Sequence, residues 1–144
     1  MDMIRQITFF GWRRRSARRT RGVAAAELAV CLPVVVLLVI ATIEACSAIF
    51  LKQSLTVAAY EGVRTALEEA GTSGAVQAAC NQILTDRKVR GAQVTLRPAN
   101  VAALQPGDYI DVTVTAPCDA NSLVPTAFYR GRSLSATASM MVEY

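Results

Sequence analysis

The chain contains an uninterrupted apolar stretch, which limits the folds open to it. No charged residue occurs from Leu28 to Ile43, and an Ala-rich approach from Val23 and a continuation to Phe50 extend the helical pattern to 28 residues. At about 1.5 Å per residue such a helix measures roughly 42 Å, more than the hydrocarbon core of a bilayer, which is about 30 Å thick. A small domain cannot enclose a helix that is apolar on every side. The sequence therefore predicts a membrane-spanning helix over residues 23–50.

Positive charge is concentrated before this stretch. Residues 1–22 contain seven arginines and one acidic residue, Asp2, which leaves eight of the fifteen basic and ten of the eleven acidic residues for the rest of the chain. By the positive-inside rule, residues 1–22 are a basic cytoplasmic leader and residues 51–144 form an extracytoplasmic domain. We expect a single-pass protein of the bacterial inner (cytoplasmic) membrane. Because the high pI comes from the leader, it does not indicate a nucleic-acid partner.

The composition disfavours catalytic and metal-binding classes. The chain has no His, and its four Cys form no CxxC pair, so the commonest general base and the usual zinc-site patterns are missing. The acidic grouping Asp108, Asp111 and Asp119 is better explained by solvated turns than by acid–base chemistry. We expect no enzymatic activity, no cofactor and no metal.

A carboxylate stands at the start of the apolar stretch. A charged Glu27 in mid-bilayer would cost on the order of 3 kcal/mol, so it needs a partner. A cut after Gly22 would leave a positive ammonium on Val23, one helical turn from Glu27. The alternative is an interfacial Glu stabilised by the helix dipole. Pro33, in the first third of the span, removes a backbone hydrogen bond and predicts a kink there.

These residues resemble the processing site of type IV prepilins, in which a basic leader and a Gly precede the cut and an acidic fifth residue opens an apolar helix. Within that group the sequence is most similar to the TadE-like family, minor pseudopilins of tight-adherence pilus systems. The similarity lies in the Ala-rich acidic opening at 24–33 and in the helical continuation at 59–64. The resemblance implies cleavage between Gly22 and Val23 by a prepilin peptidase. It also implies that Glu27 pairs with the amino terminus of a neighbouring subunit during assembly.

The resemblance implies a structural subunit with several partners: membrane lipid, other pilins or pseudopilins, and the inner-membrane platform that assembles the pilus. The alternative is an uncleaved, membrane-anchored scaffold or binding module of an export machine. A lipoprotein signal that ends at Cys46 is disfavoured by the charged Glu44. A conventional signal peptide is disfavoured because its apolar region is about 7 to 15 residues long.

Beyond the span, the pattern predicts an α+β domain. Apolar residues spaced by four from Leu51 to Leu67 continue the long helix as an amphipathic one, residues 71–74 end it, and residues 76–84 form a short second helix. Period-two alternation then predicts three strands, at 94–96, 110–116 and 134–142. A small antiparallel sheet with the helices on one face satisfies these patterns.

Two cysteines fall on the core-facing sides of these elements. Cys80 lies on the apolar face of the second helix, and Cys118 shares the parity of the inward residues of the second strand. In an oxidising compartment a bond between them would close a loop of 38 residues, worth roughly 4 kcal/mol in the chain-entropy model. We expect this disulfide, with two buried thiols as the alternative. Cys31 and Cys46 are expected to be packing residues of the span.

Overall fold

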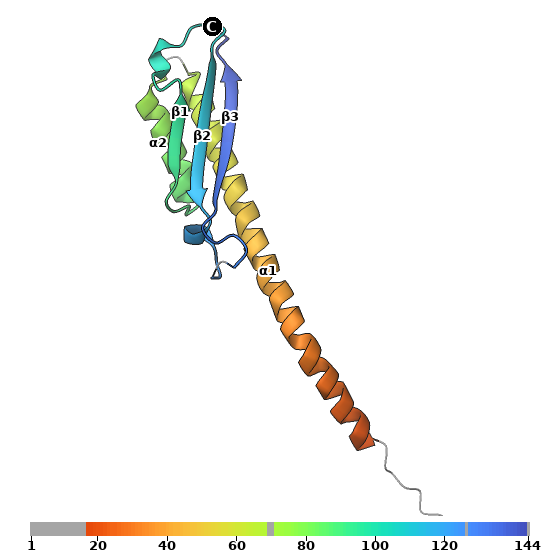
Figure 1. Cartoon of the computed structure of the whole chain (residues 1–144). Helices are drawn as coiled ribbons and strands as arrows, with labels where there is room; N and C mark the ends of the chain where they lie inside the picture. The colour runs from red at the N-terminus through yellow and green to blue at the C-terminus, as the bar shows by residue number, and fades with distance from the viewer. Residues whose placement is uncertain (1–16, 69–70, 126, 144) are drawn as a thin grey trace, which may run out of the picture. The chain divides into compact units, whose positions relative to one another are not determined.

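Two helices followed by three strands make up the fold of this computed structural model. It describes residues 17–68, 71–125 and 127–143, with side chains from residue 22 onward. The helices are α1 (Ala17–Ala66) and α2 (Ser73–Asp86), and the strands are β1 (Gln93–Arg97), β2 (Tyr109–Pro117) and β3 (Ser133–Met141), as Figure 1 shows. Two short 3-10 helices, η1 (Val101–Ala103) and η2 (Asp119–Asn121), lie in the loops. The predicted α+β class is confirmed.

The exposure of the side chains of α1 changes along the helix. The side chains of residues 22–39 are all exposed, and buried positions begin further along, at Glu44. Contacts divide the chain into two compact units, Met1–Leu38 and Val39–Tyr144. Among the described residues one helical stretch, Gly22–Ala66, is long and apolar enough to cross a membrane. The predicted long helix that continues as an amphipathic one is confirmed, although it begins before Val23.

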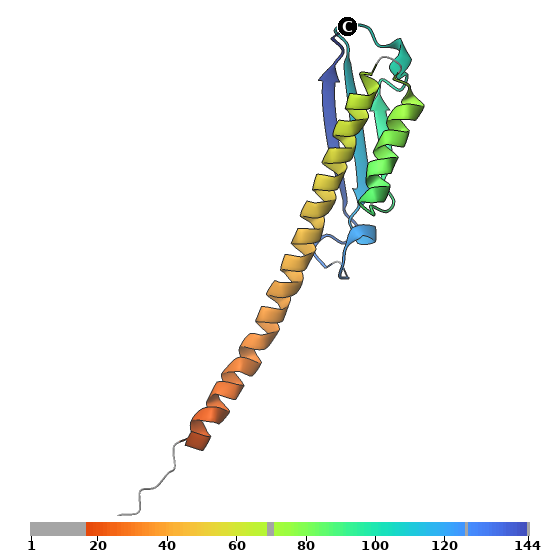
Figure 2. The same cartoon turned by 180° about the vertical axis from the view of Figure 1, so that it is seen from behind.

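The second unit is built on an antiparallel sheet in the order β1-β2-β3. The register places Val94 opposite Val114, and Val112 opposite Ala138. Figures 1 and 2 show α2 and the later part of α1 on the same face of this sheet. The predicted inward residues of β2 are all buried, and they are Ile110, Val112, Val114 and Ala116. The predicted sheet with helices on one face is therefore confirmed.

Residues spaced by four along α1 form the helical side of the core. Leu51, Leu55, Ala59 and Val63 are all buried, as the periodicity predicts. Gly62 lies beside this stripe at a close approach of three elements. A Cβ added there would lie 2.5 Å from the sulfur of Cys80 in α2 and 3.1 Å from Cγ1 of Val112 in β2. Glycine is the residue that lets these elements approach so closely.

The connection between the helices is fixed by short polar side chains. Thr72 caps α2, and its hydroxyl accepts a hydrogen bond from the backbone N–H of Ala75 at 3.2 Å. The Ser73 hydroxyl donates to the carbonyl of Ala99 at 2.6 Å and accepts from the N–H of Val101 at 3.3 Å. Helix α1 ends at Ala66, before the predicted break at residues 71–74, and α2 begins within that break at Ser73. Ser73 also ties α2 to the loop after β1.

Candidate functional site

The residues predicted for processing and assembly all lie in α1. Gly22 and Val23 are part of the continuous helix, with no atom within 4 Å of a Cβ built on Gly22 and Val23 56 % exposed. Glu27 is exposed and forms no ion pair with a described residue. Pro33 lies inside the helix. Cleavage after Gly22, pairing of Glu27 and a kink at Pro33 stay predictions, and residues 1–16 of the leader lie outside the described residues.

A second carboxylate of α1, Glu44, is almost completely buried, with 1 % of its surface exposed. Its Oε1 accepts hydrogen bonds from the backbone N–H groups of Ala127 at 3.1 Å, Phe128 at 3.0 Å and Tyr129 at 2.8 Å. The N–H of Phe128 also lies 3.2 Å from Oε2. Hydrogen bonds from N–H groups favour the ionised carboxylate and offset the cost of burying it. Glu44 therefore fastens the loop between η2 and β3 to α1.

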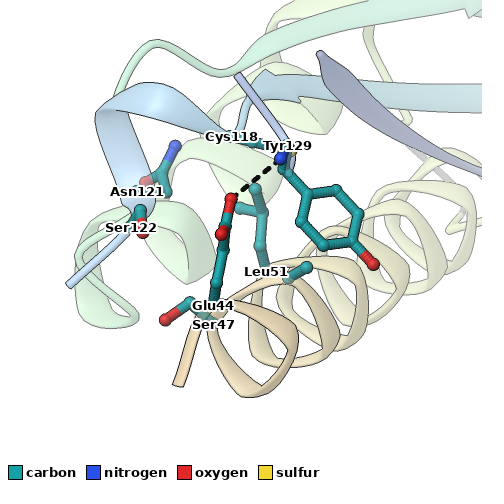
Figure 3. A pocket seen from close by; sticks show the side chains of 8 residues that line it. Glu44, Ser47, Leu51, Cys118, Asn121, Ser122 and Tyr129 are labelled. Carbon is teal, nitrogen blue, oxygen red and sulfur yellow. Dashed lines mark hydrogen bonds between the residues drawn. The ribbon is translucent and has the colours of Figure 1, made fainter. Parts of the chain in front are cut away.

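The surroundings of Glu44 leave no room for a ligand. Figure 3 shows its carboxylate directed at the Tyr129 backbone, with Ser47, Leu51 and Cys118 around it. The remaining cavity measures about 10 Å³, which is at most the space of one water molecule. The arrangement can hold a loop in place, but it cannot bind a substrate.

Sequence reasoning missed the role of Glu44, although a signal was present. Glu44 is the only charged residue between Leu28 and Leu51. A carboxylate inside an apolar helix needs partners, and this holds for Glu44 as it does for Glu27. The partners of Glu44 are 83 to 85 residues away in the sequence. The need for partners was therefore visible, but their identity was not.

The predicted Cys80–Cys118 disulfide is not formed in the structure, where both cysteines are buried free thiols. The Cys80 thiol donates to the carbonyl of Ala58 at 3.3 Å, whereas Cys118 lies in the cavity with Leu51. The prediction of core-facing cysteines is confirmed, and their bond, which the structure does not show, stays a prediction.

Both thiols are in surroundings that disfavour the thiolate. Burial raises the pKa of Cys80 above its ordinary value. Burial also raises the pKa of Cys118, with a further contribution from the nearby Asp119 carboxylate. Because the thiolate is the reactive form, the two side chains act as small apolar packing groups. Cys31 and Cys46 are exposed along α1.

The three carboxylates considered for an enzyme are not brought together. Asp108 precedes the nine-residue strand β2 and Asp119 follows it, so the two are separated by roughly 30 Å of extended chain. Each supports a loop, because Asp108 accepts from the N–H of Gln105 at 2.9 Å and Asp119 from the N–H of Gly131 at 2.8 Å. Among the described residues there is no group of His, Cys, Asp and Glu side chains that could hold a metal ion.

An apolar helix of this length that leads into a small α+β domain fits a single-pass membrane protein. Residues 22–64 match the family model described as TadE-like protein. Over this segment the chain is similar to the TadE-like family, and the resemblance seen in the sequence is confirmed. The match includes Gly22, Glu27, Pro33 and Glu44. No curated protein and no solved structure matches the chain.

Proposed function

We propose that this protein is a minor pseudopilin, a structural and assembly subunit of a tight-adherence, type IV-like pilus or a related secretion apparatus. The observation that carries the proposal is the TadE-like match over residues 22–64, because it includes the glycine and the acid of the predicted processing site. The role needs no active site. It needs a helix that enters a membrane and packs against partners.

The proposed mechanism starts with cleavage between Gly22 and Val23 by a prepilin peptidase. The new ammonium on Val23 and the Glu27 carboxylate are then available for pairing between neighbouring subunits. Glu27 supports this proposal, since it is exposed and no described residue pairs with it. The partners are other pilins or pseudopilins, the inner-membrane assembly platform and membrane lipid, with the α+β domain outside the cytoplasm.

We further propose a shorter span than the sequence suggests. Residues 22–39 are exposed throughout, and 18 helical residues measure about 27 Å, close to the hydrocarbon thickness of about 30 Å. From Val39 onward the helix belongs to the second compact unit. The membrane segment on this proposal ends near Val39 and not at residue 50.

Amino-terminal sequencing of the protein extracted from its native membrane tests the processing step. We expect a mature protein that begins at Val23, and a Gly22→Leu variant that keeps its leader. An intact leader on the natural protein would contradict cleavage. That result would favour the alternative function, an uncleaved anchored scaffold or binding module of an export machine.

Co-purification of partner subunits tests the assembly step. We expect Glu27→Ala to reduce the recovery of other pilus subunits while membrane insertion is retained, because the partner ammonium loses its counter-charge. Glu61→Ala, at a partly buried acid of the domain, is the matched control and should leave recovery unchanged. Equal recovery with both variants would remove the role proposed for Glu27.

A further inference from the structure

We propose that the domain carries a binding groove for one anionic phospholipid at the level where α1 leaves the membrane. The groove has a volume of about 760 Å³ and lies between α1, the turn after α2 and the segment that begins at η2. Ligand pockets in proteins have similar volumes. Apolar side chains form much of its lining, and they include Ile43, Phe50, Leu51, Val89 and Leu123. The inference rests on the proposed membrane span.

Three cations, Arg87, Lys88 and Arg90, line one side of the groove. None of their side chains forms an ion pair with a described residue. The dipole of α2 favours cations at its end, which accounts for Arg87 at the C-cap. Lys88 and Arg90 lie beyond the cap and are exposed. The helix dipole therefore explains Arg87 but not the presence of Lys88 and Arg90 at the groove.

The wall that carries these cations is held by Asn121. Its Oδ1 accepts from the N–H of Arg90 at 2.8 Å, and its Nδ2 donates to the carbonyls of Arg90 at 2.9 Å and Pro117 at 2.8 Å. Both contacts at Arg90 use backbone atoms, so its side chain stays available. The turn and η2 thus form a connected rim, and the exposed apolar side chain of Leu123, 85 % accessible, follows it.

The position of the groove along α1 indicates which kind of molecule occupies it. If the hydrocarbon core ends near Val39, Ile43 lies about 6 Å and Cys46 about 10 Å further along the helix. The headgroup layer on each side of a bilayer is roughly 5–8 Å thick. The groove residues of α1 therefore begin at headgroup depth. Cations next to an apolar surface at this depth match an anionic headgroup with its attached acyl chains.

Native mass spectrometry of the full chain, released from detergent in equal amounts of phosphatidylglycerol and phosphatidylcholine, tests the proposal. We expect one phosphatidylglycerol to be retained in preference to phosphatidylcholine. Lys88→Ala with Arg90→Ala should weaken this retention on the order of thirtyfold, because each cation contributes about a fivefold factor. The matched control is Arg64→Ala with Arg97→Ala, which removes two exposed cations elsewhere and should retain the lipid.

A soluble analogue of the headgroup tests whether binding also requires the acyl chains. Soluble glycerol 3-phosphate should not displace the lipid at equal concentration, because it lacks the acyl chains that would occupy the apolar part of the groove. Leu123→Ser should weaken retention as well. Equal retention of the two lipids, or unchanged retention in the Lys88→Ala and Arg90→Ala variant, would overturn the proposal. The second result would point instead to an acidic protein segment as the occupant.

The lipid proposal and the pseudopilin proposal fail in different ways. Loss of the lipid preference would leave leader cleavage and membrane retention of the natural protein unchanged. Failure of the proposed function would appear as an intact leader on that same protein. Circular dichroism of each variant shows that the domain is folded before its lipid binding is compared.

Discussion

At the residue scale, the two carboxylates of α1 are satisfied differently. Glu44 is buried and receives N–H donors from a loop of its own chain. Glu27 is exposed in an apolar segment and has no described ion-pair partner. A carboxylate in an apolar environment needs a cation or hydrogen-bond donors, and in the proposed assembly a neighbouring subunit supplies this partner to Glu27. This contrast is the residue-level support for the proposed assembly role.

Replacement of Glu44 tests its function as a loop anchor. We expect Glu44→Ala to release the segment that contains Ala127, Phe128 and Tyr129, because their N–H groups lose the acceptor. Their amide hydrogen exchange, measured on the full chain in detergent micelles, should accelerate on the order of tenfold or more. Glu44→Gln keeps one carbonyl acceptor and should give an intermediate rate. Unchanged exchange in Glu44→Ala would show that other contacts hold the loop.

At the element scale, the domain depends on how closely α1, α2 and β2 approach one another. The periodic apolar residues of α1 define a face, but Gly62 sets how near α2 and β2 lie to that face. The Cys80 side chain fills the space that a Cβ at this position would take. Close packing of this kind leaves little freedom for extra atoms.

Substitution at Gly62 tests this packing. We expect Gly62→Ala to lower the free energy of unfolding by about 1–3 kcal/mol, because the added methyl overlaps the Cys80 sulfur. Gly62→Ala combined with Cys80→Ala should recover part of this loss, since the sulfur is removed. The measurement is denaturant unfolding of each single variant and of the double variant.

Gly74→Ala is the control for the Gly62 series. A Cβ at Gly74 meets nothing within 4 Å and the residue lies in α2, so this change should be neutral or slightly stabilising. A Gly62→Ala protein as stable as the natural one would mean that α2 can move away from α1 at little cost.

At the scale of the whole molecule, one continuous helix serves two environments. Its exposed apolar part, residues 22–39, has the length of a bilayer core, and from Val39 onward it forms part of the domain. The exposed side chains of the domain part, such as Ile49 at 58 %, are on this view outside the hydrocarbon. The position of the boundary determines which residues can tolerate charge.

A pair of charge substitutions locates that boundary. Val35 and Ile49 have nearly the same exposure, 55 % and 58 %. We expect Val35→Asp to disfavour membrane insertion by about 2.5–3.5 kcal/mol, as for an acid near the centre of a span, and Ile49→Asp to insert normally. Retention in carbonate-washed membranes measures the difference. Equal loss of insertion in both variants would restore a span that reaches residue 50.

The sequence alone determined the features that depend on local periodicity and on composition. Local patterns indicate which face of an element is apolar. These patterns are the apolar run, the four-residue spacing of Leu51 and Leu55, and the alternation from Ile110 to Ala116. This information predicts a long helix, a second helix and three strands. It also places Cys80 and Cys118 in the core. The predicted processing motif around Gly22 and Glu27 is likewise local, and for that reason the sequence alone indicates it.

Which buried groups meet depends on the packing of the elements and is seen in the structure. Parity shows that Cys80 and Cys118 face inward, but it does not give their positions along the helix and the strand, so it does not establish a bond between them. Glu44 finds its donors 83 to 85 residues away, and the groove with Lys88 and Arg90 joins three segments. Distances between remote segments depend on how elements pack. Periodicity within one element contains no information about those distances.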